Sequence, residues 1–203
     1  METVKIGNQV WKLNNCTVKK FRNGENIHHS VSKENWEECG LMKKPAWCYY
    51  DFDEKNEKYG LLYNGYVFIH KEGEFGEDGF RTPDFDDLYE LEESIGGREN
   101  VDSLKSDNGW FKVSEDNLSN NPITYNDNFG FKCLPSGWVN RKGEFSQLGR
   151  GIGTSSSLAK FWTETDDDTG KLWCRIFGRR FISHAGEPEN GYSVRLIKGD
   201  KID

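Results

Sequence analysis

The chain has 203 residues, 34% of them hydrophobic and 14% aromatic, which fits one globular domain with a large aromatic core. Its formal net charge of −7 argues against a general nucleic-acid-binding protein, because such proteins bind by neutralising phosphates. Since no apolar run approaches the ~18 residues that a transmembrane helix needs, we expect no membrane span.

The first predicted element is a β-hairpin over residues 4–11, in which Gly7-Asn8 is typical of a tight turn between two short strands. A helix is predicted to begin near Ser32 and to end before Pro45. Three residues of this helix are expected to face the core: Trp36, Cys39 and Leu41.

A second helix is predicted after Thr82-Pro83-Asp84, because these residues favour the cap and the first turn of a helix. Asp86 and Asp87 suit the positive end of the helix dipole, and Gly96-Gly97 is expected to end the helix. The apolar face of this helix comprises Leu88, Leu91 and Ile95.

Beyond Val101 the sequence predicts short strands joined by long loops rich in glycine and asparagine. No internal repeat and no low-complexity linker divides the chain, so we expect a single domain over residues 1–203. Two helices packed on a twisted, mostly antiparallel sheet with long loops make this an α+β fold.

The cysteines form no obvious disulfide framework. There are five of them, Cys16, Cys39, Cys48, Cys133 and Cys174. An odd number leaves at least one cysteine unpaired, and the sequence contains no C-x-x-C motif. We therefore expect free cysteines that serve as small buried apolar residues.

Charge is distributed unevenly along the chain. Residues 51–102 contain 16 acidic and 5 basic residues, whereas residues 171–201 contain 7 basic and 3 acidic residues. The basic segment includes an alternating strand, with Leu172, Cys174 and Ile176 on one face and Trp173, Arg175 and Phe177 on the other. If the tryptophan belongs to the core, the two faces exchange roles.

The sequence places a candidate docking surface on this basic segment. Arginine and aromatic side chains are enriched at interface anchors, where they provide bidentate hydrogen bonds and large contact areas. The predicted partner-binding residues are Arg175, Arg179, Arg180, His184, Phe177 and Phe181, bordered by Arg150, Trp162 and the turn at Asp166, Asp167 and Asp168. A basic surface of this kind predicts an acidic protein or glycan partner.

The three aspartates of that turn are also the candidate metal ligands. Calcium prefers clustered carboxylates and carbonyl oxygens on a flexible loop, and Asp166, Asp167 and Asp168 precede Thr169-Gly170. A solvated hairpin turn is the alternative interpretation of the same residues. We expect no metal and no other cofactor, with calcium kept as the alternative.

Glycine, proline and tryptophan landmarks run through the chain in a fixed order. They lie in Thr3–Trp11, Lys44–Tyr50, Tyr59–Asn64, Asn128–Phe131, Leu134–Trp138, Phe161–Thr165, Leu172–Arg175 and Asn190–Arg195. This series resembles the Fibrobacter succinogenes major paralogous domain, a bacterial module placed with the C-type-lectin-like and formylglycine-generating-enzyme folds. The resemblance covers nearly the whole chain.

The resemblance implies a C-type-lectin-like fold, in which the first and last strands, near residues 4–11 and 192–197, lie side by side in one sheet. It also implies that strands and loops on a fixed scaffold recognise a partner. Members of the family are commonly exported, whereas this chain opens on Met1-Glu2-Thr3-Val4-Lys5 without an export signal. We expect a cytoplasmic protein for the chain as given, and a cell-surface or secreted one if a leader was removed. The oligomeric state is left open.

The sequence can also be compared with the residues that related folds use for catalysis and for sugar binding. Formylglycine-generating enzymes need two closely spaced cysteines where this chain has Cys174 alone. Sugar-binding C-type lectins hold calcium with a Glu-Pro-Asn triplet, but Glu187-Pro188-Glu189-Asn190 carries an extra glutamate. A calcium-dependent lectin and a glycoside hydrolase with a carboxylate pair remain alternatives. We expect a non-catalytic recognition module that binds a protein or glycan partner.

Overall fold

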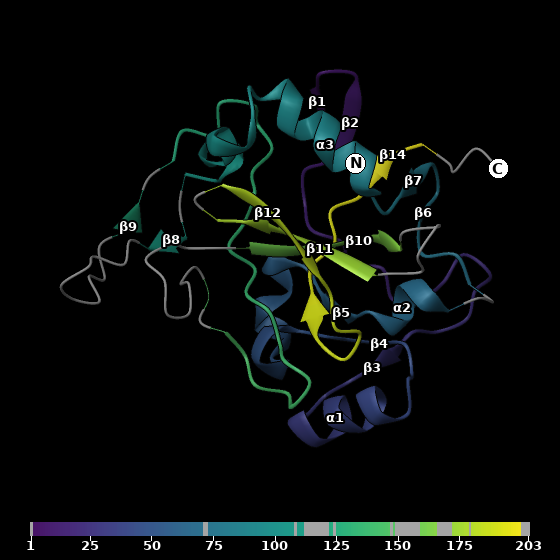
Figure 1. Cartoon of the computed structure of the whole chain (residues 1–203). Coiled ribbons are helices and arrows are strands. Elements are labelled where there is room, and N and C mark those ends of the chain that lie inside the picture. The colour runs from purple at the N-terminus through teal and green to yellow at the C-terminus, as the bar shows by residue number, and fades with distance from the viewer. Residues whose placement is uncertain are drawn as a thin grey trace.

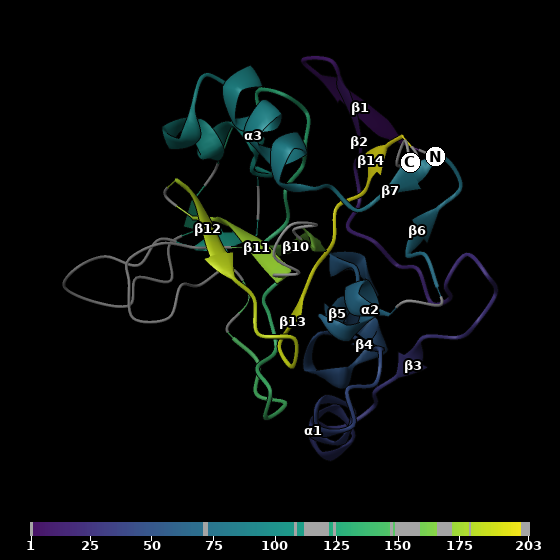
Figure 2. The same cartoon turned by 45° about the vertical axis from the view of Figure 1, so that its right-hand side comes forward.

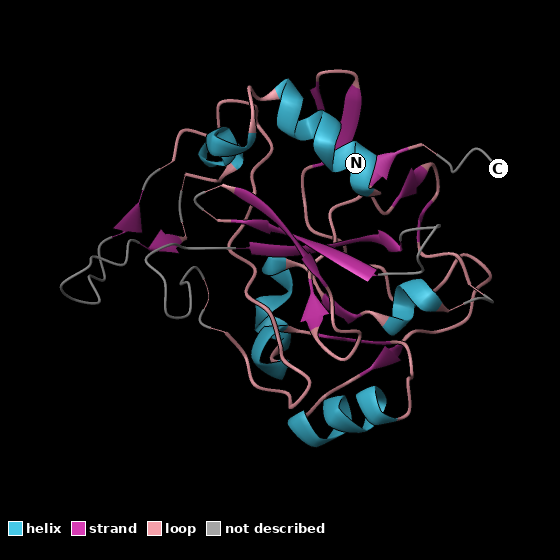
Figure 3. Cartoon of the chain, in the orientation of Figure 1, coloured by secondary structure: helices cyan, strands magenta, loops and turns pink. Residues whose placement is uncertain are grey.

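The computed structural model describes residues 2–70, 73–107, 109–111, 122–123, 125–146, 148, 159–165, 172–178 and 180–199. Within these residues the helices are α1 (Lys33–Leu41), α2 (Tyr66–Ile69) and α3 (Phe85–Ser94), with 3-10 helices at Tyr50–Phe52, Glu54–Tyr59 and Arg98–Leu104. Figures 1 and 2 show α1 and α3 at opposite ends of the molecule. Figure 3 shows strands and long loops between them, and the chain is an α+β protein.

The two ends of the chain meet in a five-stranded sheet. Its strand order is β1 (Thr3–Ile6), β2 (Gln9–Lys12), β14 (Ile197–Lys198), β7 (Phe80–Arg81) and β6 (Gly76–Glu77). Ile197 of β14 pairs with Trp11 on one side and with Arg81 on the other. The predicted hairpin and the predicted proximity of the first and last strands are therefore confirmed.

The other described strands form three more sheets. The three-stranded sheet that crosses the middle of the molecule in Figure 1 has the order β10 (Ala159–Thr165), β11 (Leu172–Phe177) and β12 (Phe181–Ala185). The four-stranded sheet has the order β13 (Gly191–Tyr192), β5 (Leu62–Asn64), β4 (Ala46–Cys48) and β3 (His28–His29). The last sheet pairs β8 (Trp110–Phe111) with β9 (Pro122–Ile123).

This arrangement corrects the expectation of two helices on one sheet. The described residues contain a third, short helix and four sheets, and β3 and β4 are parallel whereas the other strand pairs among them are antiparallel. Most of the strands have only two to four residues, which is shorter than the usual five to six.

Helix α3 follows the sequence prediction closely. Asp84 caps it: the Asp87 N–H donates to Asp84 Oδ1 at 2.8 Å, and the Asp84 N–H donates to Asp87 Oδ2 at 2.8 Å. Gly96 and Gly97, which follow the helix, both have positive φ angles. The predicted apolar face is buried and consists of Leu88, Leu91 and Ile95.

Helix α1 departs from its prediction at one residue. Ser32 caps the helix by accepting from the Asn35 N–H, and Trp36 and Cys39 are buried as expected. Leu41, however, is 82% exposed. It lies five residues after Trp36, which corresponds to about 140° around a helix of 3.6 residues per turn, so it points away from the core. No helix in the described part of the chain is long and apolar enough to cross a membrane.

The central sheet separates two of the apolar clusters that make up the core. Phe161 and Phe177 pack into a cluster with Leu91 of α3, whereas Trp162 and Cys174 pack into a second cluster with Tyr63 of β5. Both faces of β10 and β11 therefore pack on apolar clusters, whereas β12 exposes Ile182 and His184.

All five cysteines are free and buried, which confirms their predicted role as apolar residues. Burial raises the pKa of Cys16 and of Cys133 to about 12, and that of Cys174 to about 11. These thiols therefore stay protonated near neutral pH, where they have little nucleophilic character.

Candidate functional site

Arg175, the first residue of the predicted docking surface, is buried with only 6% of its surface exposed. Its Nη2 pairs with the Glu92 carboxylate of α3, and its Nη1 donates to Ser183 Oγ at 2.6 Å. The guanidinium also lies 4.8 Å from the ring centroid of Phe181. Burial lowers the pKa of Arg175 to about 10. Arg175 thus connects β11 to α3 inside the protein and is not available to a partner.

The predicted aromatic docking residues are also part of the core. Phe177 and Phe181 are buried in the cluster beneath α3, and Trp162 is buried in the second cluster, where its Nε1 donates to the Tyr63 carbonyl at 2.6 Å. The interpretation of residues 172–177 as a strand with one open face is therefore wrong, because both faces of β11 pack on apolar clusters. Trp173 is half-buried and lies 6.4 Å, ring to ring, from Phe85 of α3.

Two predicted docking residues lie at the surface. The Arg180 side chain is 50% exposed, 4.0 Å from a Glu99 carboxylate oxygen, and His184 is exposed on β12. Arg150, Arg179 and the turn at Asp166, Asp167 and Asp168 lie outside the described residues. Within the described part of the chain, the predicted basic surface is reduced to Arg180 and His184.

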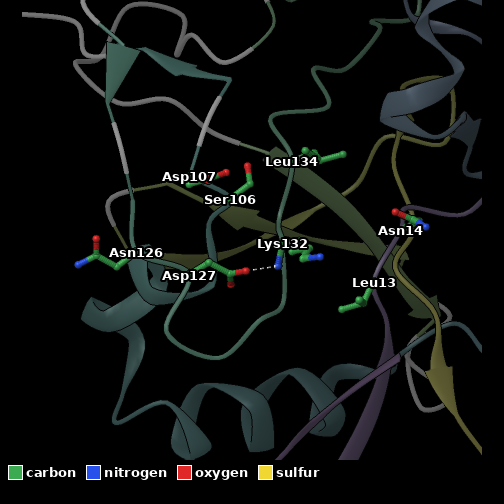
Figure 4. Close-up of a pocket in the computed structure, with 8 residues that line it drawn as sticks. All are labelled: Leu13, Asn14, Ser106, Asp107, Asn126, Asp127, Lys132 and Leu134. Carbon is green, nitrogen blue, oxygen red and sulfur yellow. Dashed lines mark hydrogen bonds between the residues drawn. The ribbon is translucent and has the colours of Figure 1, made fainter. Parts of the chain in front are cut away.

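A hollow of about 510 Å³ lies elsewhere, between the loop after β2 and the loop before Pro135. We call it the polar cleft, and Figure 4 shows its lining side chains. It is lined by Leu13, Asn14, Ser106, Asp107, Asn126, Asp127, Lys132 and Leu134. Its volume falls within the range of small-molecule sites, and most of its lining residues carry hydrogen-bonding groups.

Arg195 holds the walls of the polar cleft together from inside the protein. Its Nη1 donates to the carbonyl oxygens of Leu13 at 2.6 Å and Phe131 at 2.8 Å, and its Nε and Nη2 donate to Asn15 Oδ1. The guanidinium lies 4.7 Å from the Phe131 ring centroid. Burial lowers the pKa of Arg195 to about 10. Arg195, three residues after the end of β13, thereby connects two segments that are more than a hundred positions apart in sequence.

Asp127 and Lys132 form a strained turn at the edge of the cleft. Both residues have positive φ angles, 39° and 52°, and the Lys132 N–H donates to Asp127 Oδ2 at 3.1 Å. The other carboxylate oxygen, Oδ1, is buried and has no hydrogen-bond partner in the described part of the chain. Burial raises the pKa of Asp127, against the smaller opposing effect of the backbone donors of Lys132 and Phe131. Strained backbone and an unsatisfied acceptor together are typical of functional sites.

A second hollow, of about 240 Å³, lies next to the polar cleft, and Asn126 lines both. Tyr125 lines the second hollow, with its ring centroid 4.6 Å from Lys105 Nζ. Burial raises the pKa of Tyr125 to about 12, so its hydroxyl is neutral at physiological pH. The remaining lining residues of this hollow are Glu99, Asn100, Asp102, Ser103 and Asn128.

The sequence interpretation did not identify the cleft. Its walls come from residues 13–14, 106–107 and 126–134, which no local pattern brings together. The Asn126-Asp127-Asn128 run before Phe129-Gly130 is the available signal, because asparagine, aspartate and glycine tolerate positive φ angles and favour turns.

The metal alternatives have no support among the described residues. No group of three or more His, Cys, Asp and Glu side chains that could hold a metal ion occurs in that part of the chain. The lectin-like segment is engaged in contacts inside the protein: Glu189 Oε1 accepts from the Tyr66 hydroxyl at 3.1 Å, and Asn190 Nδ2 donates to Glu187 Oε2 at 3.3 Å.

Comparison with known proteins assigns a family. Neither a curated protein nor a solved structure matches the chain. The model of the Fibrobacter succinogenes major domain family matches residues 4–198, which is nearly the full length. The chain therefore belongs to the Fibrobacter succinogenes major domain family.

Proposed function

We propose that this domain is a non-catalytic recognition module that binds a glycan in the polar cleft, on a scaffold of the C-type-lectin-like class. The observation that carries the proposal is a concave site lined by amide, hydroxyl and carboxylate groups, with two leucines among them. Such a lining suits sugars, because sugar hydroxyls donate and accept hydrogen bonds while their C–H faces pack on apolar side chains.

The side chains of the cleft have free hydrogen-bonding capacity. Within the described residues, no hydrogen bond engages the amide of Asn14 or of Asn126, and Asp127 Oδ1 has no donor. A ligand hydroxyl that donates to this oxygen relieves the cost of an unsatisfied buried acceptor. Because Asn126 also lines the neighbouring hollow, the two hollows suit an oligosaccharide better than one sugar unit.

The proposed scaffold class is supported by connectivity. The first and last strands are neighbours in one sheet, and long loops outside that sheet form the walls of the cleft. An experimental structure whose chain path departs from C-type-lectin-like folds contradicts this part of the proposal and leaves the cleft unaffected.

One observation favours the glycoside hydrolase as a second candidate. Asp107 and Asp127 line the same cleft, and a raised pKa, as burial gives Asp127, is what a general acid needs. A hydrolase and a binder differ in turnover, so one set of variants separates them.

The experiment compares the wild-type domain with Asn126→Ala and Lys132→Ala on immobilised and soluble oligosaccharides. We expect at least about tenfold weaker binding for each variant, since each loses a hydrogen-bonding group of the cleft. Lys142→Ala, which changes an exposed residue that lines neither hollow, is the control and should bind like the wild type. Wild-type binding by both cleft variants contradicts the proposal.

Turnover is measured on the same glycans. We expect no release of reducing ends by the wild-type protein. If the wild-type protein releases reducing ends and both Asp107→Asn and Asp127→Asn abolish this release, the domain is a glycoside hydrolase and not a non-catalytic recognition module.

A further inference from the structure

Lys160 lies on β10, on the face of the central sheet that also carries Trp162 and Cys174. Its side-chain nitrogen, Nζ, lies 4.1 Å from the ring centroid of Trp138 and 5.1 Å from that of Tyr192. An ammonium group over the faces of two aromatic rings is a favourable cation–π arrangement. The two ring faces contact the ammonium group but provide no oxygen or nitrogen acceptor for its N–H donors.

Two other lysines withdrawn from solvent, Lys12 and Lys105, have carboxylate partners. Lys12 Nζ lies 2.5 Å from Glu77 Oε2, and Lys105 Nζ lies 2.6 Å from Asp102 Oδ1. For Lys160, no hydrogen bond or ion pair reaches Nζ from the described residues. An ammonium has three donors and no acceptor, so its donors remain open to a ligand.

The groups around Lys160 are mostly neutral. Burial raises the pKa of Cys174 to about 11 and raises that of Tyr192 further, so both stay protonated at neutral pH. Glu187 is the nearby carboxylate, and it accepts a hydrogen bond from Asn190 Nδ2 at 3.3 Å. Burial lowers the pKa of Lys160 against the smaller opposing effects of Cys174 and Glu187.

We propose that Lys160, Trp138 and Tyr192 form a second binding site, which takes the carboxylate of an acidic sugar. The carboxylate pairs with Nζ and supplies acceptors that the described residues do not, and the sugar ring packs on the half-buried Trp138. This site is built from β10, β13 and the loop before Val139, and it shares no lining residue with the polar cleft. The Lys160 site goes beyond the proposed function. It provides a place for the acidic partner that the sequence predicted, although Arg175 itself is buried.

The test follows Lys160 directly by NMR, through its ¹³Cε signal in lysine-labelled protein. We expect sodium glucuronate to shift this signal and to raise the pKa of Lys160, because the bound carboxylate favours the ammonium form. Glucose, which lacks the carboxylate, should leave both unchanged, and acetate at equal concentration should act more weakly because it lacks the ring. An unchanged pKa with glucuronate, an equal effect of glucose, or an equal effect of acetate overturns the proposal.

Variants check the same site by calorimetry. Lys160→Met keeps an unbranched side chain of similar size without the charge, and it should weaken glucuronate binding at least about tenfold. Lys142→Met, at an exposed lysine, is the matched control. Asn126→Ala should leave glucuronate binding intact, which separates this site from the polar cleft. Wild-type affinity in a folded Lys160→Met variant also overturns the proposal.

Discussion

At the scale of single residues, two arginines that could have been surface residues are buried and have structural roles. Arg175 satisfies Glu92 across the interface between β11 and α3, and Arg195 satisfies backbone carbonyls of Leu13 and Phe131. Both arginines are buried with hydrogen-bonding partners at their Nη atoms, as buried charges require, although Arg175 Nε has no partner within the described residues. The sequence shows that an arginine is present but not whether its partners lie in solvent or inside the fold.

Asp127 carries a prediction about pH. Its folded-state pKa is raised, so its ionised form destabilises the native state at pH values above that pKa, and the penalty disappears as the pH falls below it. Asp127→Asn removes the charge and keeps an acceptor for the Lys132 N–H. We therefore expect the variant to unfold at a higher urea concentration than the wild type at pH 7, with the difference shrinking toward pH 4.

The same variant should lose glycan binding, because the amide lacks the charge that strengthens a hydrogen bond from a sugar hydroxyl. Urea titrations at pH 7, 5.5 and 4 give the stability difference, and Asp107→Asn serves as the matched control. A variant that is less stable than the wild type at pH 7 shows that the backbone donors, and not burial, dominate at Asp127.

At the scale of elements, predictability depends on whether the signal is local. The start, the end and the buried face of α3 are determined by residues close together in sequence, from the Asp84 cap to Gly96-Gly97. All three predictions agree with the structure. The faces of β11 depend instead on α3 and β5, which cover them from remote parts of the chain. Alternation along a strand cannot reveal that both faces are buried, so Arg175 and Phe177 were wrongly expected at the surface.

The cap of α3 supplies the second prediction. Asp84→Ala removes the acceptor for the Asp87 N–H and should lower the free energy of unfolding by about 1 kcal/mol. Asp86→Ala changes an exposed acidic residue in the same first turn and should cost no more than about 0.5 kcal/mol, since it alters only the interaction with the helix dipole. Urea denaturation measures both, and equal losses for the two variants contradict the role of the cap.

At the scale of the whole molecule, the sites arise from long-range connections. Arg195 connects two of the three segments that form the polar cleft, and the Ser106 N–H joins the third by donating to the Cys133 carbonyl. The Lys160 site is formed where β10 and β13 meet the Trp138 loop. The family landmarks predicted the pairing of the chain ends. Neither site was predicted, because charge and periodicity along the sequence do not show which distant residues share a surface.

The same connections predict one cooperative unfolding transition. β10 contributes Phe161 to the cluster beneath α3 and Trp162 to the cluster beside β5, so neither half of the core keeps its packing when the central sheet opens. Ile197→Ala, at a residue that is 3% exposed, should therefore lower the free energy of unfolding by about 2–4 kcal/mol and shift the whole transition. Ile182→Ala makes the same chemical change at a residue that is 44% exposed and should have a much smaller effect. Tryptophan fluorescence and far-ultraviolet circular dichroism should give coincident urea curves for both variants. Two separate transitions, of which Ile197→Ala moves only one, would show that the chain contains two independently folding units.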